Sequence, residues 1–264
     1  MQKCTNRFFA MGMKMRRLIY IGLCLILVLG LTGCDEIASI VQGEKLLAVE
    51  YGTLSETASA DYVSDGYTKV TYNSASDVVL AVENMKASYG ILDEFQLNSF
   101  IDAERNIKKS EECDYSMAYC AYFDSENSAL QKEFNEAIEE LKNNGTIDEI
   151  KNAHLKGEEY KRNKAKNENG TLTMLCDPHF DNRVYRNSND EIVGLDVDIA
   201  YEICNYLGYD LEISATDFDE LFVDLSEGEG DFVVSACEVD EERAEYYLLS
   251  DSYFTLNFYL IERN

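Results

Sequence analysis

The stretch LTMLCDPHFDNRVYRNSNDEIVGLDVDIA, from Leu172 to Ala200, decides how this chain folds. Its apolar start, residues 172–175, has the length and composition of a short buried strand and ends at an Asp177-Pro178 turn. The GLDVDIA run opens a helix that we expect over 195–207. A buried strand followed by a turn and an amphipathic helix is typical of a sheet covered by helices.

The same alternation extends in both directions from this stretch. Downstream, the apolar pattern predicts strands at 211–214 and 232–236 around a helix at 219–225. Upstream, it predicts strands at 46–52, 69–72 and 89–92, helices at 76–86 and 128–142, and an extended segment at 120–123. Strands and helices that alternate at this spacing indicate an α/β protein with mainly parallel sheets.

Two parts of the chain resemble the two halves of the bacterial solute-binding proteins of family 3, the bilobal amino-acid receptors of ABC importers. Residues 170–264, with GLDVDIA and EERAEYY, resemble the family's N-terminal half. Residues 46–155, with LLAVEYGT, ASYGILDEF and NNGTIDEI, resemble the half that normally follows. The two halves are exchanged here. The resemblance implies a type II periplasmic-binding-protein-like α/β fold, with two lobes that each hold a mainly parallel sheet flanked by helices, in circularly permuted order.

This order suggests a division of the chain. We expect a lipoprotein signal peptide at 1–33, a lipid-anchored tether at 34–45, lobe 2 at 46–115, a hinge crossing with a helix returning to lobe 1 at 116–155, a linker joining the family's old termini at 156–169, and lobe 1 at 170–264. One covalent crossing, near Ser116 to Phe123, would then join the lobes. The alternative is a truncated tandem array whose halves complement those of another molecule.

The first residues have the pattern of an exported lipoprotein. Lys14, Arg16 and Arg17 precede an apolar run over 18–31. A basic flank, a short apolar core and small residues before a cleavage site describe a secretory signal. The LTGC sequence that ends at Cys34 matches the bacterial lipobox, so we expect acylation of this cysteine. The alternative is a signal peptide that carries a cysteine by chance.

Charge and composition exclude several classes of partner and cofactor. The chain has 23 Lys and Arg against 50 Asp and Glu, and all of its acids lie after the expected leader. Such an acidic surface repels nucleic acid and anionic lipid headgroups. The cysteines show no metal-binding spacing and only two histidines are present, so we predict neither a metal site nor a cofactor.

The resemblance places two charged residues in the ligand site. Arg243 matches the family's carboxylate-binding arginine, and a planar guanidinium suits a carboxylate because it binds in a bidentate manner. Asp93 matches the family's ammonium-binding aspartate, at the carboxyl end of a strand. Thr53, after Gly52, matches the step where a helix N-terminus faces the ligand carboxylate. The alternatives are a solvated Arg243 and an Asp93 that only caps a helix.

Four further positions follow from the same resemblance. Phe180 matches the aromatic residue that covers the ligand side chain, and Phe218 a second apolar wall, although either could be ordinary core. Ala236 and Glu238 stand where the family supplies small or hydroxyl groups to the ligand carboxylate. Glu238 is a departure, since its charge could repel that carboxylate, neutralise Arg243, or select a ligand with an extra positive group.

Other features of this half remain open. Asn182-Arg183 replaces a common Pro-Phe pair of the family. Cys176 and Cys237 end strands that the resemblance makes neighbours, so they either form a disulfide or stay as two buried thiols. The sequence favours neither.

The resemblance implies a function and leaves two alternatives. We expect a monomeric, lipid-anchored receptor on the extracytoplasmic face of the cell membrane, which binds an amino acid or a related zwitterion for an ABC permease. The first alternative is a sensor or degenerate surface lipoprotein of the same fold. The second is an enzyme, because some relatives of this fold are dehydratases, but the sequence places no general base or nucleophile and we expect no catalysis.

Overall fold

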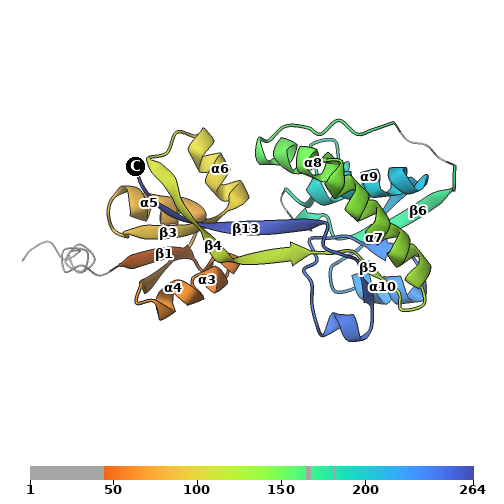
Figure 1. The fold of residues 1–264 in the computed structure, drawn as a ribbon, viewed down its shortest axis with the longest axis horizontal. Helices are drawn as coiled ribbons and strands as arrows, with labels where there is room; N and C mark the ends of the chain where they lie inside the picture. The colour runs from red at the N-terminus through yellow and green to blue at the C-terminus, as the bar shows by residue number, and fades with distance from the viewer. Residues whose placement is uncertain (1–44, 165–167, 181) are drawn as a thin grey trace, which may run out of the picture.

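The computed structural model describes residues 45–164, 168–180 and 182–264, which form two lobes (Figure 1). The expected signal peptide, Cys34 and the tether before Lys45 lie outside the described residues. No helix in the described ranges is both long enough and apolar enough to cross a membrane.

Lobe 2 is built on a five-stranded sheet with the order β2-β1-β3-β13-β4. Its strands are β1 (Leu46–Glu50), β2 (Thr68–Tyr72), β3 (Tyr89–Asp93), β4 (Ile107–Tyr119) and β13 (Phe254–Arg263), and its helices are α3 (Leu54–Ala58), α4 (Ala60–Ser64), α5 (Ala75–Glu83) and α6 (Glu94–Asp102). β1 pairs in parallel with β2 and β3, whereas β13 is antiparallel to both β3 and β4. Four strands therefore run in one direction and β13 runs against them.

Both faces of this sheet are buried. Leu46 and Ala48 of β1 pack in one cluster with the apolar side of α5, and Leu47 and Val49 pack in another with Ala58 of α3. Successive side chains of a strand point to opposite faces, so an unbroken apolar run is what a strand covered on both sides requires. The LLAV sequence therefore contributes to the hydrophobic core on both faces of the lobe 2 sheet.

Lobe 1 holds a second five-stranded sheet with the order β10-β6-β11-β5-β12 and a small sheet, β7-β8-β9. Its strands are β5 (Tyr122–Phe123), β6 (Thr171–Cys176), β7 (His179–Phe180), β8 (Val184–Arg186), β9 (Ile192–Val193), β10 (Asp210–Ala215), β11 (Phe232–Val233) and β12 (Leu248–Leu249). Its helices are α7 (Ser128–Asn143), α8 (Thr146–Leu155), α9 (Leu195–Leu207), α10 (Leu221–Glu227) and the 3-10 turn η1 (Arg243–Glu245).

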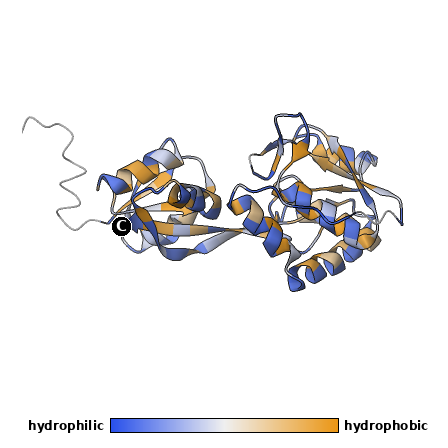
Figure 2. Cartoon of the chain, turned by 90° about the horizontal axis from the view of Figure 1, so that it is seen from above, coloured by the Kyte–Doolittle hydropathy of each residue, from blue (hydrophilic) through white to orange (hydrophobic). Residues whose placement is uncertain are grey.

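The core of lobe 1 again lies on both faces of its sheet. Helices α7, α8 and α9 pack on one face, where Phe134 of α7 sits 4.7 Å from the ring of Phe232 in β11. Helix α10 covers the other face with Leu221 and Leu225. Hydrophilic and hydrophobic residues alternate along the helices, as expected for helices with one buried side (Figure 2).

The two large sheets share one topology. In each of them the first strand of the lobe (β1 or β6) lies between the second (β2 or β10), which forms an edge, and the third (β3 or β11). Between the third and fourth strands an antiparallel strand enters from the part of the chain that builds the other lobe, β13 in lobe 2 and β5 in lobe 1. This agrees with the predicted α/β fold of two lobes, each with a mainly parallel sheet flanked by helices.

One expectation about the connection between the lobes was wrong. We expected a single covalent crossing and assigned 170–264 to lobe 1, but β13 leaves lobe 1 and pairs with β4 from Phe254↔Tyr119 to Arg263↔Ile107. Two antiparallel strands therefore pass between the lobes (Figure 1). The LNFYLI sequence of β13 is apolar enough to fill the centre of the lobe 2 sheet, where Phe258, Leu260 and Ile261 are buried.

The segment over 156–164 lies against α9. Arg162 Nε donates to Asp198 Oδ1 at 2.7 Å, and Asn163 donates through both its backbone and its side chain to Glu202. These two carboxylates are buried. Buried charges are stable only with partners, so the polar linker sequence has a structural use: it covers the acidic side of a helix whose apolar side faces the core.

Cys176 and Cys237 do not form the disulfide that the sequence left open. All five cysteines of the described residues are free and buried. Cys176 packs with the cluster on the α7–α9 face, and Cys237 packs with Leu225 on the α10 face. Their thiols lie on opposite faces of the sheet, because Cys176 follows the alternation of Leu172 and Met174 along β6.

A glycine at the start of α9 gives a test of this packing. Gly194 has a φ of +134°, and a Cβ placed there would lie 2.2 Å from the carbonyl oxygen of Arg183. Gly228 has a φ of +78° with no atom within 4 Å of such a Cβ. We expect Gly194→Ala to lower the free energy of unfolding by about 1–3 kcal/mol more than Gly228→Ala does, because only the first substitution adds a steric clash to backbone strain. Urea denaturation of both variants measures the difference, and equal losses would contradict this account.

Candidate functional site

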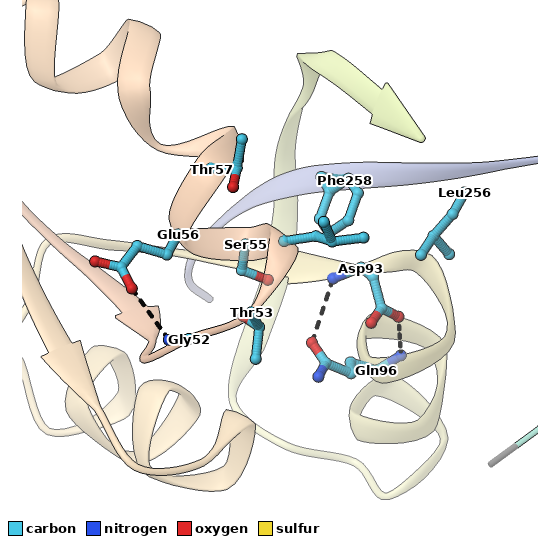
Figure 3. Close-up of a pocket in the computed structure, with 10 residues that line it drawn as sticks. Gly52, Thr53, Ser55, Glu56, Thr57, Asp93, Gln96, Leu256 and Phe258 are labelled. Carbon is cyan, nitrogen blue, oxygen red and sulfur yellow. Dashed lines mark hydrogen bonds between the residues drawn. The ribbon is translucent and has the colours of Figure 1, made fainter. Parts of the chain in front are cut away.

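Two cavities meet at Asp93, on the side of lobe 2 that faces lobe 1. The first, about 680 Å³, lies within lobe 2 and is lined by Gly52 to Thr57, Asp93, Gln96, Leu256 and Phe258 (Figure 3). The second, about 610 Å³, has walls from both lobes, and we call it the interlobe pocket. It is lined by Leu54, Ala75, Asp93, Phe95, Gln96, Ser99, Phe100, Tyr119, Phe180, Asn182, Arg183, Ala236, Glu238 and Leu256.

Asp93 is the last residue of β3 and the N-cap of α6. Its Oδ1 accepts a hydrogen bond from Gln96 N at 2.9 Å, and Gln96 Oε1 accepts one from Asp93 N at 3.3 Å (Figure 3). This reciprocal pair is a capping box, which satisfies two free N–H groups at the helix start. Asp93 thus caps a helix and also lines both cavities.

The carboxyl group of Asp93 has an unusual proton affinity. Burial, more than any other influence, raises its pKa to about 6, and the neighbouring charges of Glu94 and Glu50 act in the same direction. The hydrogen bonds from Gln96 N and Phe95 N oppose this rise. No Lys, Arg or His of the described residues forms an ion pair with Asp93. No cationic side chain of the described residues therefore balances its charge.

Thr53 lines the cavity within lobe 2, but its own groups are already engaged. It is the N-cap residue of α3, yet its hydroxyl donates to Glu50 O at 3.0 Å instead of capping the helix. The preceding N–H, of Gly52, donates to Glu56 Oε2 at 3.0 Å. Glu56 is in turn paired with Lys69, whose hydrogen bond holds the pKa of the glutamate below its usual value.

The interlobe pocket brings together four of the predicted site residues. Asp93 comes from lobe 2, and Phe180, Ala236 and Glu238 come from lobe 1. Ala236 has a φ of +50°, a conformation uncommon for an alanine, and its N–H donates to Asp196 Oδ2 at 2.7 Å. These residues lie far apart in the sequence, and only the docking of two lobes places them on one cavity.

Arg183 is a pocket residue that sequence reasoning missed. Its Nε donates to Asp196 Oδ1 at 2.8 Å, and Nη2 lies 2.7 Å from the same oxygen without hydrogen-bond geometry. The guanidinium stacks on the rings of Tyr119 at 3.8 Å and Phe254 at 4.6 Å. The signal was present: a basic residue stands where the resemblance expects an apolar pair, in a segment that is poor in bases.

Arg243 and Phe218 are not among the residues that line the interlobe pocket. The backbone N–H of Arg243 donates to Asp240 Oδ1 at 2.9 Å, and its Nη1 lies 3.6 Å from Asp240 Oδ2. Its guanidinium lies over Phe222 at 5.0 Å and Phe218 at 5.8 Å. Phe218 contacts Phe180 at a centroid distance of 5.7 Å. Arg243 thus contacts Phe218, which in turn contacts the pocket residue Phe180.

Glu238 is held in place by its backbone. Its carbonyl oxygen accepts a hydrogen bond from the Tyr122 hydroxyl at 2.6 Å, and its backbone bridges to Tyr119 at the end of β4. Glu238 lines the pocket, and among the described residues its carboxylate forms neither an ion pair nor a hydrogen bond. Nor do the described ranges contain a group of three His, Cys, Asp or Glu residues able to hold a metal ion.

The raised pKa of Asp93 predicts a pH dependence of stability. The folded protein holds a proton on this group up to about pH 6, whereas an unfolded aspartate releases it near pH 4. The stability of the wild type should therefore fall between pH 4 and pH 6 relative to Asp93→Asn, by about 2–3 kcal/mol. Asparagine is also a good N-cap, so the variant keeps the helix start.

Denaturant midpoints of both proteins at pH 4 and pH 6.5 check this expectation. A difference between wild type and Asp93→Asn that does not change with pH would contradict the assigned proton affinity.

Comparisons with known proteins agree with the resemblance over part of the chain. Residues 172–264 match the sequence model of the bacterial extracellular solute-binding proteins, family 3. The arginine-binding extracellular protein ArtP of Bacillus subtilis (strain 168) is 32% identical over 74 residues, which is 28% of this chain and 29% of ArtP. The membrane-bound lytic murein transglycosylase F of Desulfosudis oleivorans (strain DSM 6200 / JCM 39069 / Hxd3) is 32% identical over 69 residues, 26% of this chain and 15% of that enzyme.

Solved structures give matches of similar extent. The arginine-bound form of domain 1 from TmArgBP is 30% identical, with a TM-score of 0.32, and the match covers 36% of this chain and 81% of that one. The unliganded, open L-cystine solute receptor of Neisseria gonorrhoeae is 22% identical, with a TM-score of 0.28, over 30% of this chain and 34% of the receptor. This chain thus spans less than a third of the length of the curated relatives it matches.

Proposed function

Residues 172–264 belong to the bacterial extracellular solute-binding proteins, family 3, and on this basis we propose that the whole chain is a receptor that closes its two lobes around a small zwitterion, most simply an amino acid. The observation that carries the proposal is the interlobe pocket, which joins Asp93 of lobe 2 to Phe180, Ala236 and Glu238 of lobe 1. A cavity between two lobes is a common place for a small ligand, because closure can enclose it.

The predicted site residues take defined roles in this proposal. Asp93 binds the ligand ammonium, since its carboxylate has no cation of its own. Arg243 binds the ligand carboxylate once closure moves its loop toward the pocket, and Thr53 with its neighbouring backbone completes the clamp. Phe180, backed by Phe218, forms the apolar wall. The closed form requires Arg243 to exchange its contact with Asp240 for the ligand.

One relative supports an amino acid as ligand, because ArtP is named as an arginine-binding protein. The family description places its members outside the cell. We extend this to a lipoprotein anchored through Cys34 that delivers its ligand to an ABC permease. Some relatives are transglycosylases, but we propose binding without catalysis for this chain.

A second candidate function rests on the same pocket. Glu238 faces it without a partner, and Arg243 does not line it. These two features favour a binding module that has lost the usual amino-acid contacts, such as a sensor subunit or a degenerate surface lipoprotein without a transport role. Ligand binding, tested below, separates this candidate from the first.

We also propose that the exchanged halves represent a circular permutation within one molecule. β1 and β13 flank β3, and their outer ends, at Leu47 and Ile261, pair with the adjacent positions Tyr89 and Gly90 of β3. Strands two places apart in a sheet are separated by roughly 10 Å. A short turn could therefore join β13 to β1 in an unpermuted relative, and the linker over 156–169 supplies the new connection.

A thermal-shift screen against the amino acids tests the receptor function. A ligand at 100 times its dissociation constant should stabilise the protein by about 2.7 kcal/mol. Arg243→Ala and Asp93→Asn should each reduce the shift, because each removes one charge that holds the zwitterion. If no amino acid stabilises the wild type, the second candidate function replaces the first.

The permutation predicts a monomer. A permuted chain completes both sheets with its own strands, so the protein should elute as a single copy at micromolar concentration. Light scattering during gel filtration gives the mass directly. An obligate dimer with exchanged halves would support the truncated tandem array instead.

A further inference from the structure

The charges on the walls of the interlobe pocket do not balance. Three of the lining residues are charged: Asp93, Arg183 and Glu238. The charge of Arg183 is matched by Asp196, which is fully buried and pairs with the guanidinium at 2.7 Å. The pocket thus presents two unmatched carboxylates, one from each lobe.

Arg243 does not change this sum. It lies outside the pocket lining, and Asp240 stands 3.6 Å from its guanidinium. If the loop moves so that Arg243 meets the carboxylate of a ligand, that cation balances the ligand carboxylate and leaves Asp93 and Glu238 as before. The imbalance therefore belongs to the pocket in either arrangement.

Closure of the lobes gives the two unmatched carboxylates an energetic cost. Asp93 and Glu238 line one cavity from opposite lobes, so the proposed closure would bring them closer, and the energy of two like charges rises as their distance falls and as water leaves. An enclosed ammonium can neutralise Asp93 alone, which leaves Glu238 as a buried, unpaired charge. A second positive group on the ligand removes that cost.

The rest of the wall suits such a group. Phe95, Phe100 and Phe180 line the same cavity, and the faces of aromatic rings attract cations. This chain already uses that interaction nearby, where the guanidinium of Arg183 stacks on Tyr119. Aromatic rings and unpaired carboxylates together form a favourable environment for an organic cation.

We propose that the interlobe pocket selects ligands with two separate cationic groups, one for Asp93 and one for Glu238, and that neutral zwitterions do not close it. The inference rests on the proposed receptor function and narrows its ligand to basic amino acids. Diamines share the same two cationic groups without a carboxylate, and they form the second arm of the test.

Isosteric ligand pairs test the charge requirement on the wild-type protein. Arginine and citrulline have nearly the same shape, and only arginine carries a side-chain cation. Titration calorimetry of the full chain in 150 mM salt should show arginine or lysine binding at least about tenfold more tightly than citrulline or glutamine, since a lost bond to a buried charge has this effect. Cadaverine, which is lysine without its carboxylate, measures what the carboxylate contributes.

Glu238→Gln is the matching variant. Its carboxylate forms no ion pair in the described residues, so the exchange leaves the packing intact. The arginine-to-citrulline affinity ratio should fall by about tenfold or more in this variant. Glu241→Gln changes the net charge equally at an exposed position outside the pocket, and should leave the ratio unchanged.

Each outcome decides between the two proposals. Citrulline or glutamine binding as tightly as arginine overturns the charge inference and leaves the amino-acid receptor intact. If cadaverine binds and none of the amino acids does, the charge inference holds and the ligand is not an amino acid. If Glu238→Gln and Glu241→Gln weaken arginine binding equally, the binding depends on the overall acidity of the chain. This result also overturns the role of Glu238. If none of these compounds binds, both the charge inference and the amino-acid receptor function are wrong.

Discussion

The antiparallel pairing of β4 with β13 is the contact on which the rest of the molecule depends. It joins the lobes with two strands, and it places the apolar strand β13, which follows the last strand of lobe 1 in sequence, inside the lobe 2 sheet between β3 and β4. Tyr119 and Phe254, opposite each other at one end of this pairing, also carry the guanidinium of Arg183. The ribbon therefore both connects the lobes and forms part of the pocket between them.

Charge is distributed differently in the core of lobe 1 and in the pocket. Inside lobe 1 each buried acid has a side-chain partner: Asp177 has His179, Asp196 has Arg183, Asp198 has His154 and Arg162, and Glu202 has Asn163. The carboxylates of Asp93 and Glu238, on the pocket, have no such side-chain partner among the described residues, and Asp93 is bonded only to backbone N–H groups. Folding proteins usually pair or neutralise buried charges. The two exceptions lie on the same cavity, which is where a ligand would supply the missing charge.

Local pattern predicted much of the fold. The helix over 195–207 and the strands near 46–50 and 89–93 follow from apolar spacing, since packing on a helix or sheet face imposes a period. The place of β13 could not be predicted in this way, because its partners in β3 and β4 lie far away in the sequence. The pocket was partly predictable: the resemblance indicated Asp93 and Glu238, whereas the use of Arg183 depends on its burial against Asp196.

The position of β13 has a consequence for how the protein acquires its structure. Both strands that β13 pairs with, β3 and β4, lie more than 100 residues before it in the chain, and the lobe 2 sheet has no strand between them until that segment is available. Contacts so distant in sequence are slow to form, because a long loop must close first. During synthesis, lobe 1 can collapse around α7 and α9 before β3 and β4 have their partner β13. The half that emerges first thus becomes ordered last, and its exposed edges are the point at which a chaperone would matter most.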